Sequence, residues 1–164
     1  MIEITKSIFR EYDIRGIYPD EINEASISLI AKAISIKCNQ EDVSEICIGR
    51  DGRNSGESLL NALEKSLSNF GINVKNIGLV TTPLLLYFAA KKNKSKSGVM
   101  ITGSHNPKNY NGVKLIINDK PISGSEIYKL INQSKNQSDC AGKILKVDIK
   151  DTVTYTHLRA HETT

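Results

Sequence analysis

The sequence predicts an α/β fold: a three-layer α/β/α domain built on a mixed, mostly parallel sheet. Short apolar runs with the length of buried strands alternate along the chain with stretches of helical periodicity. This order is typical of βαβ units with helices on both faces of a sheet. One pair of apolar runs is separated by a loop alone, so these two strands can be antiparallel. With 164 residues, 39% of them hydrophobic, the chain can bury one proper core.

The first two helices are predicted from periodicity and from end signals. Residues 24–37 place apolar side chains at helical spacing, beginning with Ile27. The next helix has a start signal, because Asn54 can cap it and Glu57 follows three positions later, as in a capping box. Leucines line one side of this helix, and it ends at Gly71, where a left-handed cap favours glycine.

Two further helices begin with similar signals. Thr82 followed by Pro83 opens one of them, since proline in the first helical position loses no hydrogen bond. Ser123 and Glu126 form a second capping box, and the helix that they begin runs to about Asn132.

The strands are predicted from apolar runs that stop at glycine or at polar residues. These runs cover residues 45–48, 72–79, 97–101 and 112–117. Residues 143–147 are either a last strand or a linker.

Charge and composition argue against several classes of function. The formal charge of +4 is mild, and the lysines clustered at 91–96 are interpreted as solvated charge at a helix C-terminus. The six tyrosines and three phenylalanines are not interleaved with a basic patch, so nucleic-acid binding has little support. An anionic small substrate fits the charge at least as well.

The cellular location is inferred from the lack of membrane and secretion signals and from the cysteines. It has no apolar run of membrane-spanning length, and its first residues lack the apolar stretch of a signal peptide, so we expect no membrane contact. Three cysteines, far apart in the sequence, argue against a disulfide framework or a zinc site. They favour a reducing, cytoplasmic location.

Three polar loops carry the residues that can do chemistry. Residues 10–16 place two arginines, an aspartate and a tyrosine around one glycine, and residues 49–56 combine glycines and arginines ahead of a helix N-terminus. Residues 102–112 hold a serine, a histidine and several amides. Each loop also has a purely structural interpretation. The first can be a salt-bridged turn, the second a capping turn, and the third a polar turn held by Asn-Pro.

Ser104 is the most informative residue, because it follows a buried strand and ligands bind at strand ends in open α/β sheets. A serine hydrolase needs a G-x-S-x-G turn and a histidine that reaches the serine from elsewhere in the fold. Here position 106 is asparagine and His105 is the immediate neighbour, so acyl transfer fits poorly.

A phosphoryl carrier fits Ser104 better. Such a serine needs nearby cations to offset about two negative charges, and a group that gives or takes a proton. His105 is the candidate for proton transfer. The candidate cations are Arg15, Arg50, Arg53 and Lys114.

Taken together, these loops resemble the α-D-phosphohexomutases, and within them the bacterial phosphomannomutase/phosphoglucomutase group. The likeness runs from about Phe9 to Val147, and Tyr12 and Gly103 favour this group over the phosphoglucosamine mutases. Four stretches carry it in the family's order: Phe9-Arg-Glu-Tyr-Asp-Ile-Arg-Gly16, Gly49-Arg-Asp-Gly-Arg53, Thr82-Pro83 after a Gly-Leu-Val strand end, and Thr102-Gly-Ser-His-Asn-Pro107 with Asn111-Gly-Val-Lys114.

The resemblance implies a phosphoserine mutase that interconverts hexose 1-phosphate and hexose 6-phosphate. Ser104 would give its phosphoryl group to the hexose phosphate substrate, and a hexose 1,6-bisphosphate would be the intermediate and activator. That sugar would reorient and return its other phosphate to the serine. A Mg²⁺ ion would contact the phosphate oxygen on Ser104 and neutralise charge during transfer.

The resemblance also implies roles for the other site residues. His105 and Lys114 would assist proton transfer and phosphate binding, and Tyr12 and Arg15 would line the site. Arg53 and Asn106 would bind phosphate. Ser104 is the one metal contact expected from this chain.

Only part of the family's architecture is expected here. Family members have four domains around one cleft, and the Asp-Gly-Asp-Gly-Asp metal loop of the second domain is absent. We expect residues 1–148 to form the phosphoserine-bearing first domain, and residues 149–164 to be the start of a truncated second domain or an unrelated tail.

The expected partners of this chain are therefore the missing domains. Alone it would be inactive, and its uncovered interdomain surface would favour self-association. The alternative function is a non-catalytic phosphosugar-binding module.

Overall fold

A mixed sheet forms the centre of the computed structural model, which describes residues 3–149. The strand order is β1-β5-β4-β2-β3-β7, and β6 pairs with β5. Among the described strands only β5 runs against the others, since it is antiparallel to β4 and β1. The predicted mixed, mostly parallel sheet is thus confirmed. The strands are β1 (Ile14–Ile17), β2 (Glu45–Arg50), β3 (Asn73–Leu79), β4 (Gly98–Ile101), β5 (Tyr110–Ile117), β6 (Lys120–Pro121) and β7 (Ile144–Lys146).

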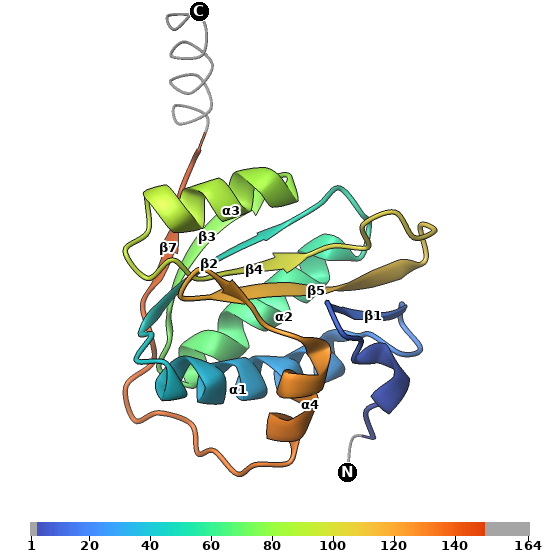
Figure 1. The fold of residues 1–164 in the computed structure, drawn as a ribbon, viewed down its shortest axis with the longest axis horizontal. Coiled ribbons are helices and arrows are strands. Elements are labelled where there is room, and N and C mark those ends of the chain that lie inside the picture. Colours follow the sequence, from blue (N-terminus) through green and yellow to red (C-terminus); the bar gives the residue numbers. More distant parts are fainter. Residues whose placement is uncertain (1–2, 150–164) are drawn as a thin grey trace, which may run out of the picture.

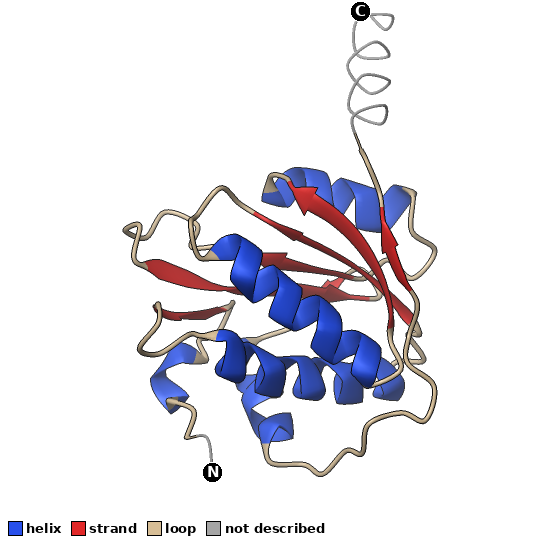
Figure 2. Cartoon of the chain, turned by 180° about the vertical axis from the view of Figure 1, so that it is seen from behind, coloured by secondary structure: helices blue, strands red, loops and turns tan. Residues whose placement is uncertain are grey.

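Helices cover both faces of this sheet and complete the three layers (Figures 1 and 2). They are η1 (Lys6–Ile8), α1 (Glu24–Gln40), α2 (Gly56–Asn69), α3 (Thr82–Lys91) and α4 (Gly124–Ile131). Because side chains alternate along a strand, the core divides into two clusters. Ile48 and Ile101 belong to the cluster that includes α1, α2 and α4, whereas Cys47 and Met100 belong to the cluster under α3.

Two of the predicted helix end signals are confirmed. The Ser123 hydroxyl accepts a hydrogen bond from the Glu126 amide at 3.2 Å, and the Glu126 carboxylate accepts one from the Ser123 amide at 3.0 Å. Gly71 follows α2 with a φ of 84°, the left-handed conformation that glycine adopts without strain.

The other two end signals are displaced by one residue. Ser55, not Asn54, is the N-cap of α2, and it makes no side-chain cap bond. Its hydroxyl instead accepts a hydrogen bond from the side-chain amide of Asn111 at 2.8 Å, so a tertiary contact replaces the cap. Thr81 caps α3, and Pro83 is therefore the second residue of that helix.

Strand β1 corrects the expectation that residues 10–16 are a loop throughout. The chain turns at residues 10–13 and then pairs with β5, placing Arg15 opposite Gly112. Arg15 and Gly16 break the apolar pattern of a strand, which is why the sequence does not predict it. In the last part of the described chain, residues 144–146 are a strand and not a linker.

The three cysteines are free and differ in exposure. Burial raises the pKa of the Cys38 and Cys47 thiols to about 12, whereas Cys140 is exposed. Because the thiolate is the reactive species, a thiol reagent should titrate one cysteine in the native protein and all three after denaturation. Rapid labelling of Cys38 or Cys47 in the native chain would contradict this packing.

The capping box of α4 predicts a pH-dependent contribution to stability. The hydrogen bond from the Ser123 backbone is the largest cause that lowers the pKa of Glu126 below its ordinary 4.5, so the folded state favours the ionised carboxylate. This stabilisation is present above pH 4.5 and is lost as the pH falls through the lowered pKa. Glu126→Gln should cost less than about 1 kcal/mol at pH 7 and nothing at pH 2 in urea denaturation. An equal cost at both pH values would show that the ionised Glu126 carboxylate does not stabilise the cap of α4.

Apolar side chains remain exposed at one edge of the sheet. Leu79 at the end of β3 is 63% exposed, and Ile144 and Leu145 on the edge strand β7 are 45% and 55% exposed. Exposed apolar edge strands favour association between chains. Light scattering should therefore show the apparent mass rising with concentration, and a monomer at all concentrations would refute this expectation.

Candidate functional site

Two loops meet at the carboxyl ends of the parallel strands β2 and β4. Residues 51–55 follow β2, and residues 102–109 connect β4 to β5; Figure 1 shows both loops on the same side of the molecule. The pairing register adds β1, because Arg15 lies opposite Gly112 and the Thr102 amide donates to the Gly112 carbonyl at 3.0 Å. Segments from three parts of the sequence thus build one site around Ser104.

Ser104 is exposed and has a φ of 53°. This left-handed conformation is uncommon for a residue other than glycine and is disfavoured by about 1–2 kcal/mol, so the surrounding structure must hold it. One such contact is local: the Ser104 amide donates to the Thr102 hydroxyl at 2.9 Å. The side-chain hydroxyl of Ser104 has no hydrogen bond within residues 3–149 and is free to react.

Asp51 connects the two loops. One carboxylate oxygen accepts hydrogen bonds from the Thr102 hydroxyl at 2.7 Å and from the Gly103 amide at 3.2 Å. The other oxygen accepts from the Arg53 amide at 3.2 Å. Since Thr102 in turn bonds the Ser104 amide, Asp51 supports the backbone that presents the serine.

Arg53 crosses from the first loop to the second. Its guanidinium donates to the carbonyl oxygens of Ser104 at 3.0 Å, Asn106 at 2.7 Å and Tyr110 at 2.9 Å, and also to that of Pro107. The Asn106 side chain closes the same loop by donating to the Gly103 carbonyl at 3.1 Å. Phosphate binding by Arg53 and Asn106 stays a prediction. Both side chains donate to backbone carbonyls of the Ser104 loop.

Arg15 is buried beneath the serine loop. It is 2% exposed, donates to the Thr102 carbonyl at 3.0 Å and pairs with Asp13. Its Nε is buried and has no hydrogen-bond partner within the described part of the chain. Arg15 therefore bonds the backbone two residues before Ser104, and its expected role in lining the site stays a prediction.

The remaining predicted residues are free to take a ligand. His105 is exposed beside Ser104, and Lys114 is half-buried on β5 opposite Met100, on the face that α3 covers. Within residues 3–149 neither side chain has a hydrogen-bond or ion-pair partner. Tyr12 is 82% exposed in the turn before β1.

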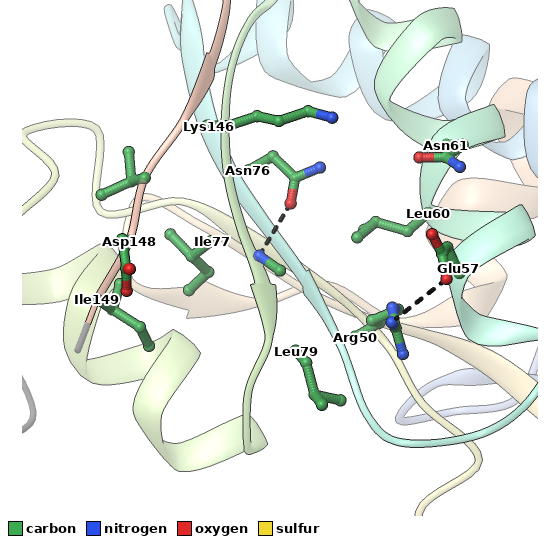
Figure 3. Close-up of a pocket in the computed structure, with 12 residues that line it drawn as sticks. Arg50, Glu57, Leu60, Asn61, Asn76, Ile77, Leu79, Lys146, Asp148 and Ile149 are labelled. Carbon is green, nitrogen blue, oxygen red and sulfur yellow. Dashed lines mark hydrogen bonds and ion pairs between the residues drawn. The ribbon is translucent and has the colours of Figure 1, made fainter.

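Arg50 lines a different pocket, although its guanidinium also donates to the Asp51 carbonyl at 3.1 Å. It faces a pocket of about 570 Å³ between α2, the end of β3 and β7, where its guanidinium lies 3.7 Å from the Glu57 carboxylate (Figure 3). Asn76 and Lys146 line the same pocket. Arg50 therefore has an ion pair within a different pocket, whereas Arg53 and Arg15 bond the backbone of the Ser104 loop.

Three residues of the site have no role in the prediction from sequence. Asp51 and Thr102 bond each other, and the fully buried Asn111 bonds Ser55 across the two loops. A usable signal for Asp51 was its position, an acid between two arginines directly after a strand.

A Mg²⁺ ion needs several oxygen ligands, commonly carboxylates. No group of three or more His, Cys, Asp or Glu residues that could hold a metal occurs among residues 3–149. Asp51 already accepts hydrogen bonds with both oxygens. The described residues thus do not by themselves provide a cluster of acidic ligands for Mg²⁺, and the expected contact of the ion with Ser104 stays a prediction.

Known proteins are similar to this chain in sequence over most of its length. Phosphoglucomutase from Neisseria meningitidis serogroup B is 42% identical over 152 residues, which are 92% of this chain and 33% of that protein. A phosphomannomutase/phosphoglucomutase from Pseudomonas putida is 40% identical over 147 residues, which are 88% and 32% of the two chains. The chain thus spans about a third of the length of these relatives.

The fold comparison agrees. The crystal structure of a phosphoglucomutase/phosphomannomutase family protein from Burkholderia thailandensis superposes with a TM-score of 0.84 at 30% identity, over 92% of this chain and 35% of that one. The family model described as "Phosphoglucomutase/phosphomannomutase, alpha/beta/alpha domain I" matches residues 6–139. The boundary expected at residues 148 and 149 stays a prediction, and residues 150–164 lie outside the described part. On these matches the chain belongs to the phosphoglucomutase/phosphomannomutase family.

Proposed function

We propose that this chain is the phosphoserine-bearing domain of a mutase that interconverts hexose 1-phosphate and hexose 6-phosphate. The observation that carries the proposal is the presentation of Ser104: its hydroxyl is exposed and unbonded, while its backbone is held by Thr102 and Arg53. A group that must repeatedly accept and release a phosphoryl group needs this combination of a free oxygen and a fixed position.

In the proposed reaction a sugar hydroxyl attacks the phosphorus on Ser104. The new sugar O–P bond forms as the bond to the Ser104 oxygen breaks, giving a hexose 1,6-bisphosphate. The attacking hydroxyl loses its proton and the serine oxygen regains one, and exposed His105 beside it can exchange both. After the sugar reorients, the same steps in reverse return its other phosphate to Ser104. Lys114 and Arg15 offset the phosphate charge from the sheet side.

Mg²⁺ belongs to this proposal as a neutraliser of phosphate charge. We propose that carboxylates outside the described residues hold it, in the part of the protein that this chain does not span. We propose that the chain alone is inactive and that its partners are the missing domains. The cysteine usage favours the cytoplasm as its location.

A fusion tests this function. Residues 3–149 would replace the matching segment of the Neisseria meningitidis phosphoglucomutase, and conversion of glucose 1-phosphate to glucose 6-phosphate would be measured. We expect turnover by the fusion and none by the isolated chain. A folded fusion that binds glucose 1-phosphate without turnover would instead support the non-catalytic binding module.

A further inference from the structure

We propose that Arg53 is a positioning residue that fixes the backbone of the Ser104 loop, and that it does not bind substrate phosphate. The inference rests on the proposed role of Ser104, because it concerns how the phosphoryl-accepting oxygen is held.

The N–H groups of the Arg53 guanidinium are already used within the protein. An arginine has five N–H groups and no acceptor. Nη1 donates to Pro107 and Tyr110, and Nη2 donates to Ser104 and Asn106. Nε lies 3.4 Å from the Asp51 carboxylate. All three nitrogens therefore face protein oxygens, and none is left to make the paired bonds by which arginine holds a phosphate.

The Arg53 guanidinium also packs closely against the Ser104 loop. Only 14% of the Arg53 side chain is exposed. A Cβ placed on Gly103 would lie 1.9 Å from Arg53 Cζ, so the guanidinium lies directly against the peptide backbone before Ser104. Neutralisation by Asp51 lets the cation stay in this place without an anionic ligand.

The contacts of Arg53 hold the loop in the conformation that presents Ser104. The four carbonyl groups belong to residues 104–110, which reverse the chain between β4 and β5, and Ser104 is left-handed within this stretch. Without Arg53, four carbonyls of the loop lose the hydrogen bonds that they accept from this side chain. The serine oxygen would then sample several positions, and misplacement by about 1 Å lowers a transfer rate by about 10²-fold.

The first test uses the 164-residue chain and needs no catalysis. Amide hydrogen exchange would be compared in wild type, Arg53→Ala and Lys108→Ala. Lys108→Ala is the control, because it removes an exposed cation from the Ser104 loop. Arg53→Ala should speed exchange of the Asn106 and Tyr110 amides, which bond within the loop, while the core strands stay protected. Lys108→Ala should behave as wild type. Unchanged exchange in Arg53→Ala would overturn the proposal.

The second test uses the fusion and separates positioning from phosphate binding. Arg53→Ala should lower kcat by about 10²-fold with little change in KM, since the loss concerns the reacting oxygen. Methylguanidinium should restore part of kcat, and Arg53→Lys should not, because one ammonium cannot reach four carbonyls. A raised KM with unchanged kcat would show a phosphate ligand and overturn the proposal.

The two failures are distinguishable. If the unmutated fusion is inactive, the proposed function fails, and the exchange experiment still decides whether Arg53 holds the loop.

Discussion

Replacing Ser104 by alanine is expected to abolish the mutase activity of the fusion, with a loss on the order of 10⁴-fold or more in kcat. Alanine removes the oxygen that we propose carries the phosphoryl group, and no other exposed hydroxyl lies beside His105 in the loop. The Ser104 contacts to Thr102 and Arg53 are made by its backbone, so the variant should keep the loop and the fold. A coupled assay for glucose 6-phosphate would measure the loss.

The matched control for this variant is Ser7→Ala, which removes an exposed serine hydroxyl from η1. It should leave kcat unchanged. If Ser104→Ala retains activity near that of the control, Ser104 is not the phosphoryl carrier, and the proposed mechanism fails.

Replacing Gly112 by alanine is expected to have a large effect on stability, a loss of about 3 kcal/mol in the free energy of unfolding. A Cβ at this position would lie 2.0 Å from the Ile14 carbonyl oxygen, and that oxygen is part of the backbone of β1. A backbone atom in a paired strand cannot turn aside as a side chain does. The β1–β5 pair would separate locally, and the ladder position that holds Arg15 would be lost with it. Urea denaturation would measure the change.

Gly52→Ala is the control for this second variant, because nothing lies within 4 Å of a Cβ at Gly52. It should change stability by no more than about 0.5 kcal/mol. Equal stability of the two alanine variants would show that β1 does not pack against Gly112 as described.

The fold could be predicted largely because its elements have local causes. The apolar run before Gly49 and the capping box of Ser123 and Glu126 depend on neighbours in the sequence, and both occur where expected. Strand β1 was missed because its stability is non-local. Arg15 is acceptable in a buried strand only because the Thr102 carbonyl and Asp13 receive its donors, and Thr102 lies 87 residues away in the sequence.

The site shows the same division. The polar loops, and Ser104 at the end of a strand, could be identified from residue types and spacing. The contacts of Arg53 could not, because they join residues more than 50 positions apart and involve backbone carbonyls that carry no sequence signal. An arginine in a glycine-rich loop suggests a phosphate ligand. In the folded chain, however, the Arg53 guanidinium already donates hydrogen bonds to backbone carbonyl oxygens.

The central claim is that Ser104 carries the phosphoryl group, and the most direct measurement is the position of phosphate on the protein. The fusion would be incubated with glucose 1,6-bisphosphate and Mg²⁺, and its intact mass and peptide masses would then be determined. We expect one added phosphoryl group, located on Ser104 and absent from Ser104→Ala. A fusion that turns over its substrate while Ser104 stays unmodified would contradict the claim.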